Sequence, residues 1–164
     1  MPRITRILCP VDFSPGSERA AVYAVELAEK LGASVMLLHA WELPVYAVPD
    51  GALAFGTEVM MRVETVMTKE AEALAARLRK RGVDLQTRVV QGVPAIEIIR
   101  RTSELGAELV VMGTHGRTGL SHLLMGSVAE RVVRTSEVPV LTVPPDRSKG
   151  AEKRTPRAER KSAS

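Results

Sequence analysis

A glycine-rich segment between a predicted strand and a predicted helix carries the clearest chemistry in this sequence. Its glycines are spaced as Gly113, Gly116 and Gly126, and Ser127 follows the last of them. Glycine lets a backbone approach an anion closely and adopt positive φ, and a helix N-terminus adds free N–H groups and a favourable dipole. The spacing predicts a phosphate-binding loop. The alternative is an ordinary surface loop that happens to be rich in glycine.

Other residues of this segment could also contact an anion. Ser127 can donate from both its N–H and its hydroxyl, and Val128 offers a further N–H at the start of the helix. Arg117 is the nearest candidate cation, with a solvated arginine as an equally good interpretation. His115 and His122 are interpreted as solvated loop residues, because no acid partner for either is evident in the sequence.

Groups that would drive phosphate chemistry are not apparent in the sequence. There is no Gly-x-x-x-x-Gly-Lys-Ser/Thr motif, so the loop lacks the lysine that P-loop enzymes use in phosphoryl transfer. There is also no Cys/His cluster with zinc-ligand spacing and no Gly-x-Ser-x-Gly elbow. We therefore predict that phosphates are held at this loop, and we assign no catalytic residue.

The elements that must position the loop alternate between strand and helix. A Ser14-Pro15 helix start and a Gly32 helix end frame the first helix. The other helices are predicted over residues 57–81, 94–105 and 127–134, with a loop over 42–56. Apolar strands are predicted over residues 4–9, 34–40, 84–90, 108–112 and 138–143. This alternation with short links predicts an α/β fold: a doubly wound five-stranded parallel sheet with helices on both faces.

Three further segments have distinctive sequences: Ile-Leu-Cys-Pro-Val-Asp-Phe-Ser over 7–14, Gly-Val-Pro over 92–94, and Val-Pro-Val-Leu-Thr-Val over 138–143. Together with the glycine loop they resemble the universal stress protein family over about residues 3–144. The resemblance implies the ATP-binding subgroup, a Rossmann-like fold of the adenine nucleotide alpha hydrolase type and the strand order 3-2-1-4-5. Ligands in such sheets bind outside the carboxyl ends of the strands, where the order reverses.

The resemblance also implies a set of contacts with an adenine nucleotide. Pro10 and Val11 would line the adenine pocket, and the backbone of Ala40 would meet the adenine edge. Met112 would cover the base, or it would simply pack in the core. Asp12 would bind the ribose or hold Mg²⁺ through the phosphates. The alternative role of Asp12 is that of a helix-capping or turn aspartate.

Charge divides the chain of 164 residues into two parts. Residues 146–164 contain seven Lys or Arg and three acids, which accounts for the whole net charge of +4. Residues 1–145 are therefore neutral, so we expect no nucleic-acid-binding surface on this predicted domain. The basic tail lacks apolar residues and is predicted to be disordered. At most it would bind nucleic acid weakly.

The remaining composition indicates a cytoplasmic protein without a membrane span. No apolar run reaches the roughly 18 residues that a spanning helix needs, and no signal-peptide core follows the first residues. The single cysteine, Cys9, cannot form an internal disulfide, and its apolar surroundings indicate a core residue.

Residues 138–143 also predict a homodimer. This strand is short, apolar and expected at a sheet edge, where unpaired N–H and C=O groups favour pairing. Two copies could pair antiparallel about a twofold axis, a mode that also resembles dimerisation in the family. In the competing interpretation, the chain after Pro144-Pro145 folds back over the edge.

Two functions follow, from different classes. The first is an ATP-binding universal stress protein that acts as a nucleotide-dependent regulatory or protective module in the stress response. The alternative is a slow ATPase or a nucleotide-dependent phosphotransferase. A third, weaker hypothesis is a binder of nucleic acid or acidic partners through the tail.

Overall fold

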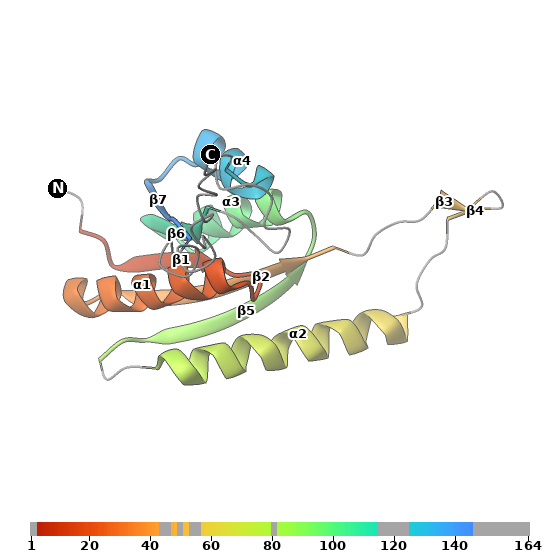
Figure 1. Ribbon diagram of the computed structural model, residues 1–164, viewed down its shortest axis with the longest axis horizontal. Helices are drawn as coiled ribbons and strands as arrows, with labels where there is room; N and C mark the ends of the chain where they lie inside the picture. The colour runs from red at the N-terminus through yellow and green to blue at the C-terminus, as the bar shows by residue number, and fades with distance from the viewer. Residues whose placement is uncertain are drawn as a thin grey trace, which may run out of the picture.

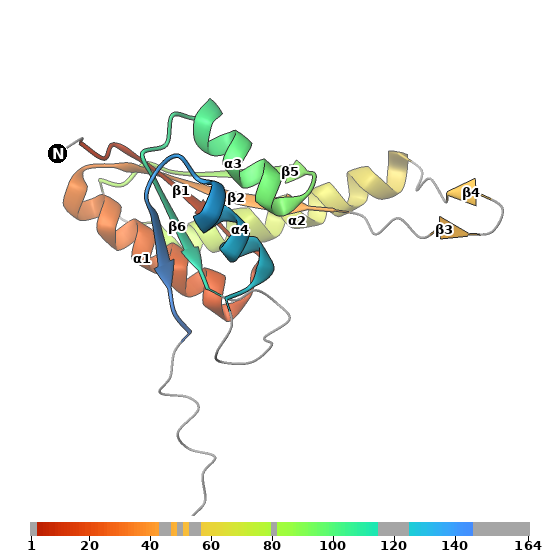
Figure 2. The same ribbon diagram turned by 90° about the horizontal axis from the view of Figure 1, so that it is seen from above.

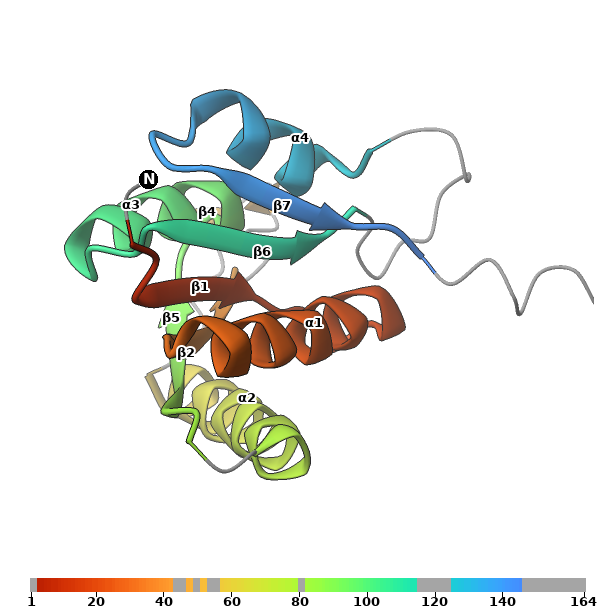
Figure 3. The ribbon, with the colours of Figure 1, turned by 90° about the vertical axis from the view of Figure 1, so that its left-hand side faces the viewer.

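The computed structural model describes residues 3–42, 47–48, 51–52, 57–79, 82–114 and 125–145. Its centre is a five-stranded sheet in the order β5-β2-β1-β6-β7, in which all neighbouring strands are parallel. Figure 3 shows β7 outermost at one edge, beside β6. The strands are β1 (Arg6–Pro10), β2 (Ser34–Trp41), β5 (Leu85–Gln91), β6 (Leu109–Gly113) and β7 (Val140–Val143). Numbered along the chain, these five have the order 3-2-1-4-5, so the predicted fold class is confirmed.

In the described ranges, four helices cover the two faces of this sheet, as Figure 1 illustrates. The helices α1 (Pro15–Leu31) and α2 (Thr57–Leu78) lie on one face, and α3 (Pro94–Glu104) and α4 (Ser127–Thr135) lie on the other. Each face has its own apolar core. Alternate residues of β1 supply both, because Ile7 and Cys9 pack against α1 whereas Leu8 packs toward α3 and α4.

The helix α1 begins and ends as its sequence predicts. The Ser14 hydroxyl accepts a hydrogen bond from the Ser17 N–H (3.2 Å), and Pro15 occupies the first turn, where its missing N–H costs nothing. Gly32 ends the helix in the left-handed conformation, at φ 67°. The start of α1 is thereby fixed directly after β1, beside the carboxyl end of the sheet.

The structure differs from the sequence prediction over residues 42–56, at the end of α2 and at the start of β7; the other predicted bounds agree with the observed ones to within two residues. The predicted loop over residues 42–56 contains two short antiparallel strands, β3 (Ala47–Val48) and β4 (Gly51–Ala52), which lie beyond the N-terminal end of α2 (Figure 2). The helix α2 ends at Leu78 rather than residue 81. The strand β7 begins at Val140 rather than residue 138, because proline at 139 has no N–H to donate; its carbonyl accepts from Val110.

The predicted boundary between a domain and a tail at residue 145 stays a prediction, because residues 146–164 lie outside the described residues. Within the described ranges, none of the helices combines the length and the apolar character that crossing a bilayer requires.

Candidate functional site

A cavity of about 320 Å³ opens where the sheet order reverses, between the carboxyl ends of β1 and β6. This volume falls within the range of small-molecule sites, about 300–1,000 Å³. The cavity is lined by the ends of β1, β2 and β6 and by the starts of α1, α3 and α4. Parallel strands all deliver their carboxyl ends to this edge, so segments far apart in the sequence meet there.

The cavity brings together nine of the eleven residues that the sequence nominates. These nine are Pro10, Val11, Asp12, Ala40, Met112, Gly113, Gly126, Ser127 and Val128. The other two, Gly116 and Arg117, lie outside the described residues. The structure adds six lining residues that the sequence did not nominate. They are Ser17, Leu38, Pro94, Ile98, Thr114 and Ala129.

The turn from β1 to α1 forms one wall of the cavity, and Asp12 lies at its centre. One carboxylate oxygen of Asp12 accepts hydrogen bonds from the Ser14 N–H (3.1 Å) and the Ser14 hydroxyl (2.6 Å). The Asp12 N–H donates to the Ser17 hydroxyl oxygen (3.2 Å). Asp12 therefore has the turn role that the sequence left open for it, and it also lines the cavity.

The start of α4 forms the opposite wall. Its N-cap residue is Gly126, which has no side chain to cap the helix, and the Gly126 N–H donates to the Thr114 carbonyl (2.8 Å). The first turn begins with Ser127, Val128 and Ala129, all of which line the cavity. The N–H groups of a first helical turn have no partner within their own helix, so they can bind an anion.

Gly126 does not have the positive φ that was predicted for the loop glycines. Its φ of −63° and ψ of 146° are an extended conformation open to other residues. Its contribution is the absence of a side chain at the mouth of the cavity. The expectation of positive φ at this position is wrong, whereas close backbone approach is still compatible with its place.

Gly113 lies where two backbone segments pack closely. A Cβ atom added to it would lie 3.1 Å from both the carbonyl carbon and the carbonyl oxygen of Gly16. Because both atoms belong to the backbone, they cannot rotate away. The end of β6 and the first turn of α1 therefore lie so close that a side chain at position 113 would push them apart by a few tenths of an ångström, which changes the spacing across the cavity.

The third side of the cavity is apolar. Pro94 and Ile98 come from α3, Ala40 comes from β2, and Met112 comes from β6. Met112 is buried in the core that it shares with Leu8, and it also lines the cavity. Packing in the core and covering a bound base, the two roles that the sequence left open for Met112, are therefore compatible.

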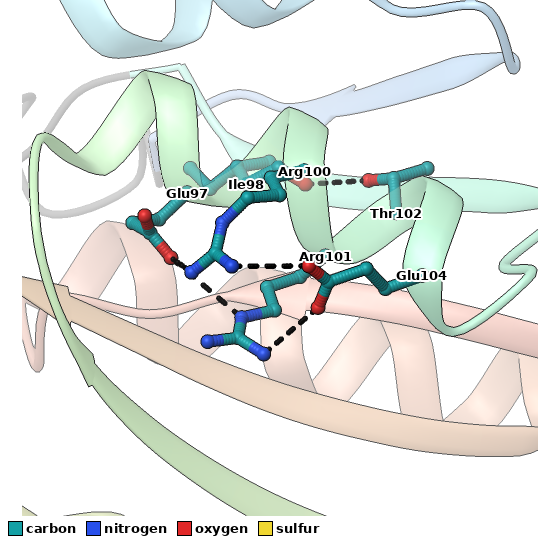
Figure 4. Close-up of polar contacts among 6 residues, drawn as sticks. All are labelled: Glu97, Ile98, Arg100, Arg101, Thr102 and Glu104. Atoms are coloured by element: carbon teal, nitrogen blue, oxygen red, sulfur yellow. Dashed lines mark hydrogen bonds and ion pairs between the residues drawn. The ribbon is translucent and has the colours of Figure 1, made fainter.

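An ion-pair cluster lies on α3, the helix that supplies Pro94 and Ile98 to this apolar side (Figure 4). The buried Glu97 carboxylate accepts from Arg100 (2.6 Å) and lies 3.6 Å from the Nε of Arg101, while both arginines also pair with Glu104. The hydrogen bond to Glu97 is the largest of the effects that raise the pKa of Arg100. Glu97 also packs against Gly92, where a Cβ would lie 2.8 Å from its side chain. The turn that leads into Pro94 is thereby fixed.

The electrostatics of the cavity are simple. Among the described residues that line it, Asp12 is the one titratable side chain. No group of three or more His, Cys, Asp or Glu in the described ranges is arranged to hold a metal ion. Within the described lining, the Asp12 carboxylate is therefore the charged oxygen ligand that could face a divalent cation.

Fold and site together define a class: doubly wound α/β proteins with a ligand-sized cavity at the point where the strand order reverses. Comparison with known proteins narrows the class. Residues 3–144 match the model of the universal stress protein family, and the chain belongs to this family.

Similar proteins agree with this assignment. The chain is 34% identical over 140 residues to Universal stress protein MJ0531 of Methanocaldococcus jannaschii, covering 84% of this chain and 81% of that protein. The solved structure of MJ0577, from the same organism, is 27% identical with a TM-score of 0.70, covering 90% of this chain and all of the other. The universal stress protein from Archaeoglobus fulgidus in complex with dAMP has a TM-score of 0.59 at 22% identity, with 87% and 98% covered. At that identity the likeness concerns the fold alone.

Proposed function

We propose that this protein binds ATP in the cavity at the sheet reversal and acts as a nucleotide-dependent regulatory or protective module in the stress response. One observation carries the proposal. A single cavity joins an apolar, strand-edge side to the uncapped start of a helix. An adenine nucleotide has the same two ends, a flat base and a chain of phosphates.

The phosphate end is assigned to the start of α4. Three successive N–H groups, those of Ser127, Val128 and Ala129, begin a helix whose N-cap is a glycine. The helix dipole adds a favourable interaction with negative charge there. Ser127 is exposed at the same place, and Gly116 and Arg117 are proposed as further contacts from the loop.

The adenine end is assigned to the edge of β2. The Val11 N–H donates to the Leu38 carbonyl (2.9 Å), and β1 ends at Pro10. Backbone groups of alternate strand residues face the same neighbour, so those of Ala40 face the side where β1 has ended. An N–H donor beside a C=O acceptor matches N1 and the 6-amino group of adenine. Guanine presents the reverse pattern at those atoms, so ATP is expected to bind more tightly than GTP.

Asp12 is proposed to contact the ribose or to hold Mg²⁺ that arrives with the phosphates. Its carboxylate already accepts two hydrogen bonds from Ser14, which fix its orientation. In the archaeal relative solved with dAMP, the same fold holds an adenine nucleotide. For this chain the proposal rests on its own cavity residues and on its family.

A homodimer through residues 138–143 is part of the proposal. The strand β7 is the outer strand of the sheet (Figure 3), and within the described ranges no other strand pairs with its outer edge. Val140, Leu141 and Thr142 are all half-buried. Two such edges related by a twofold axis can complete each other's hydrogen bonding. A cytoplasmic location stays a prediction.

Mass spectrometry of the small molecules released when the purified protein is denatured tests the proposal. We expect an adenine nucleotide in amounts approaching one per chain. A protein that releases none, and that also fails to bind added ATP, would refute it. The slow-ATPase alternative is examined on the same sample: Mg²⁺-dependent phosphate release that disappears in Asp12→Ala would support an enzyme.

A further inference from the structure

His39 is a buried polar residue that the proposed nucleotide contacts do not use. It lies on β2 between Leu38 and Ala40, both of which line the cavity, and it is only 5% exposed. Successive side chains of a strand point to opposite faces, so His39 lies on the face away from the cavity. Any effect that it has on a ligand must pass through the backbone.

The Nδ1 atom of His39 lies 2.8 Å from the Val11 carbonyl oxygen. A carbonyl can only accept, so Nδ1 must carry the hydrogen in this contact. In a regular parallel ladder, the rung after the bond from the Val11 N–H to the Leu38 carbonyl would join the Val11 carbonyl to the Ala40 N–H. The bond that the structure shows at this carbonyl comes from the His39 ring instead.

A strained residue holds the ring in place. Phe13 has φ 60°, a conformation that side-chain-bearing residues rarely adopt. Its ring lies on the His39 ring, with centroids 4.4 Å apart, and it packs against the core beneath α1. Such strain persists where the surroundings over-determine it, commonly at binding sites. Phe13 follows Asp12 directly, so the same arrangement fixes the turn at the cavity.

We propose that His39 is a positioning residue for nucleotide selectivity. By donating from Nδ1 to the Val11 carbonyl, it takes the place of the backbone rung and leaves the Ala40 N–H for the edge of the base. This inference rests on the proposed function, because it assumes that an adenine base meets the edge of β2. Without the ring, the carbonyl of Val11 draws the Ala40 N–H into the ladder, and the strand edge no longer discriminates adenine from guanine.

The test is calorimetric titration of ATP and GTP into the wild type and three variants. His39→Leu keeps an apolar side chain of similar size but has no donor. We expect its Kd for ATP to rise about five- to tenfold, the cost of one hydrogen bond, with a similar fall in the preference for ATP over GTP. His39→Asn places an amide nitrogen where Nδ1 lies, and it should restore both values to within about threefold of wild type.

Val35→Ala is the matched control, because Val35 is buried on the same face of the same strand, four residues away. It should lower the melting temperature and leave the ATP-to-GTP ratio unchanged. If His39→Leu does not fold, His39→Gln repeats the test, because its amide nitrogen lies one bond farther out than Nδ1.

The outcomes separate the two proposals. A wild type that binds no nucleotide refutes the proposed function itself. A wild type that prefers ATP, together with a folded His39→Leu or His39→Gln that keeps the same preference, overturns the role of His39 and leaves the proposed function standing. An equal fall in the ATP preference of Val35→Ala would also overturn the role of His39, because nucleotide selectivity would then follow the stability of the protein alone.

Discussion

Gly113→Ala is the substitution whose effect can best be worked out from the structure. The new Cβ would lie 3.1 Å from two backbone atoms of Gly16 and 3.4 Å from the Ser17 nitrogen. The two closest contacts fall about 0.3 Å short of ordinary van der Waals distance. Because backbone atoms cannot rotate out of the way, the end of β6 and the start of α1 must move apart by at least a few tenths of an ångström. Gly113 and Ser17 both line the cavity, so this displacement widens it.

Overpacking of this kind costs about 1–3 kcal/mol, which leaves a typical domain folded. For a chain of this size each kcal/mol lowers Tm by about 2–4 °C. We expect Tm to fall by about 2–12 °C in differential scanning calorimetry. The Kd for ATP should rise about threefold to tenfold in isothermal titration at 25 °C, because contacts across the cavity no longer form together.

Gly32→Ala is the control for Gly113→Ala. Gly32 has φ 67° and no atom within 4 Å of an added Cβ, so alanine there is strained but does not clash. The cost is about 1–2 kcal/mol, at the far end of α1 from the cavity. We expect a lower Tm and an unchanged Kd. Equal losses of affinity in the two variants, or no loss in Gly113→Ala, would refute the reasoning.

Three further expectations follow. Gly126→Val should weaken ATP binding in a folded protein, because a β-branched side chain would stand at the mouth of the phosphate end; calorimetry that shows unchanged affinity would move the phosphates elsewhere. Leu141→Asp should shift the mass toward monomer in light scattering, whereas a wild type that is monomeric at high micromolar concentration would exclude the β7 dimer. Burial raises the pKa of the Cys9 thiol to about 12, so a thiol reagent at pH 8 should react only after unfolding. Because burial favours the neutral thiol, Cys9 contributes fully to the folding stability below its ordinary pKa of 9.0. This contribution is lost as the pH rises toward 12.

The sequence predicts the fold well where local signals and burial agree. Apolar runs such as residues 34–40 are readable because strands buried on both faces need apolar residues throughout. Ser14, Pro15 and Gly32 mark the ends of α1 because capping is a local interaction. The strand order could not be obtained from such signals. It came from the family resemblance, and the structure confirms it.

The candidate site was harder to complete than the fold. Lining residues next to a glycine or at a strand end could be predicted from the sequence. Pro94 and Ile98 could not, because they reach the cavity only where α3 packs across the sheet. Ser17 could have been found, because it lies three residues after the predicted N-cap Ser14, where capping bonds form. The positive φ of Phe13 could not be predicted from the sequence, because residues with positive φ are usually glycine or asparagine.

In the proposed function, the edge of β2 and the start of α4 form one site for an adenine nucleotide. The most direct measurement is titration of the nucleotide-free protein with ATP and, separately, with GTP in the same buffer containing Mg²⁺. We expect saturable binding of one ATP per chain and a preference over GTP of about tenfold or more, the factor that corresponds to about 1.4 kcal/mol. Equal affinity for the two nucleotides, or no binding of either, would contradict it.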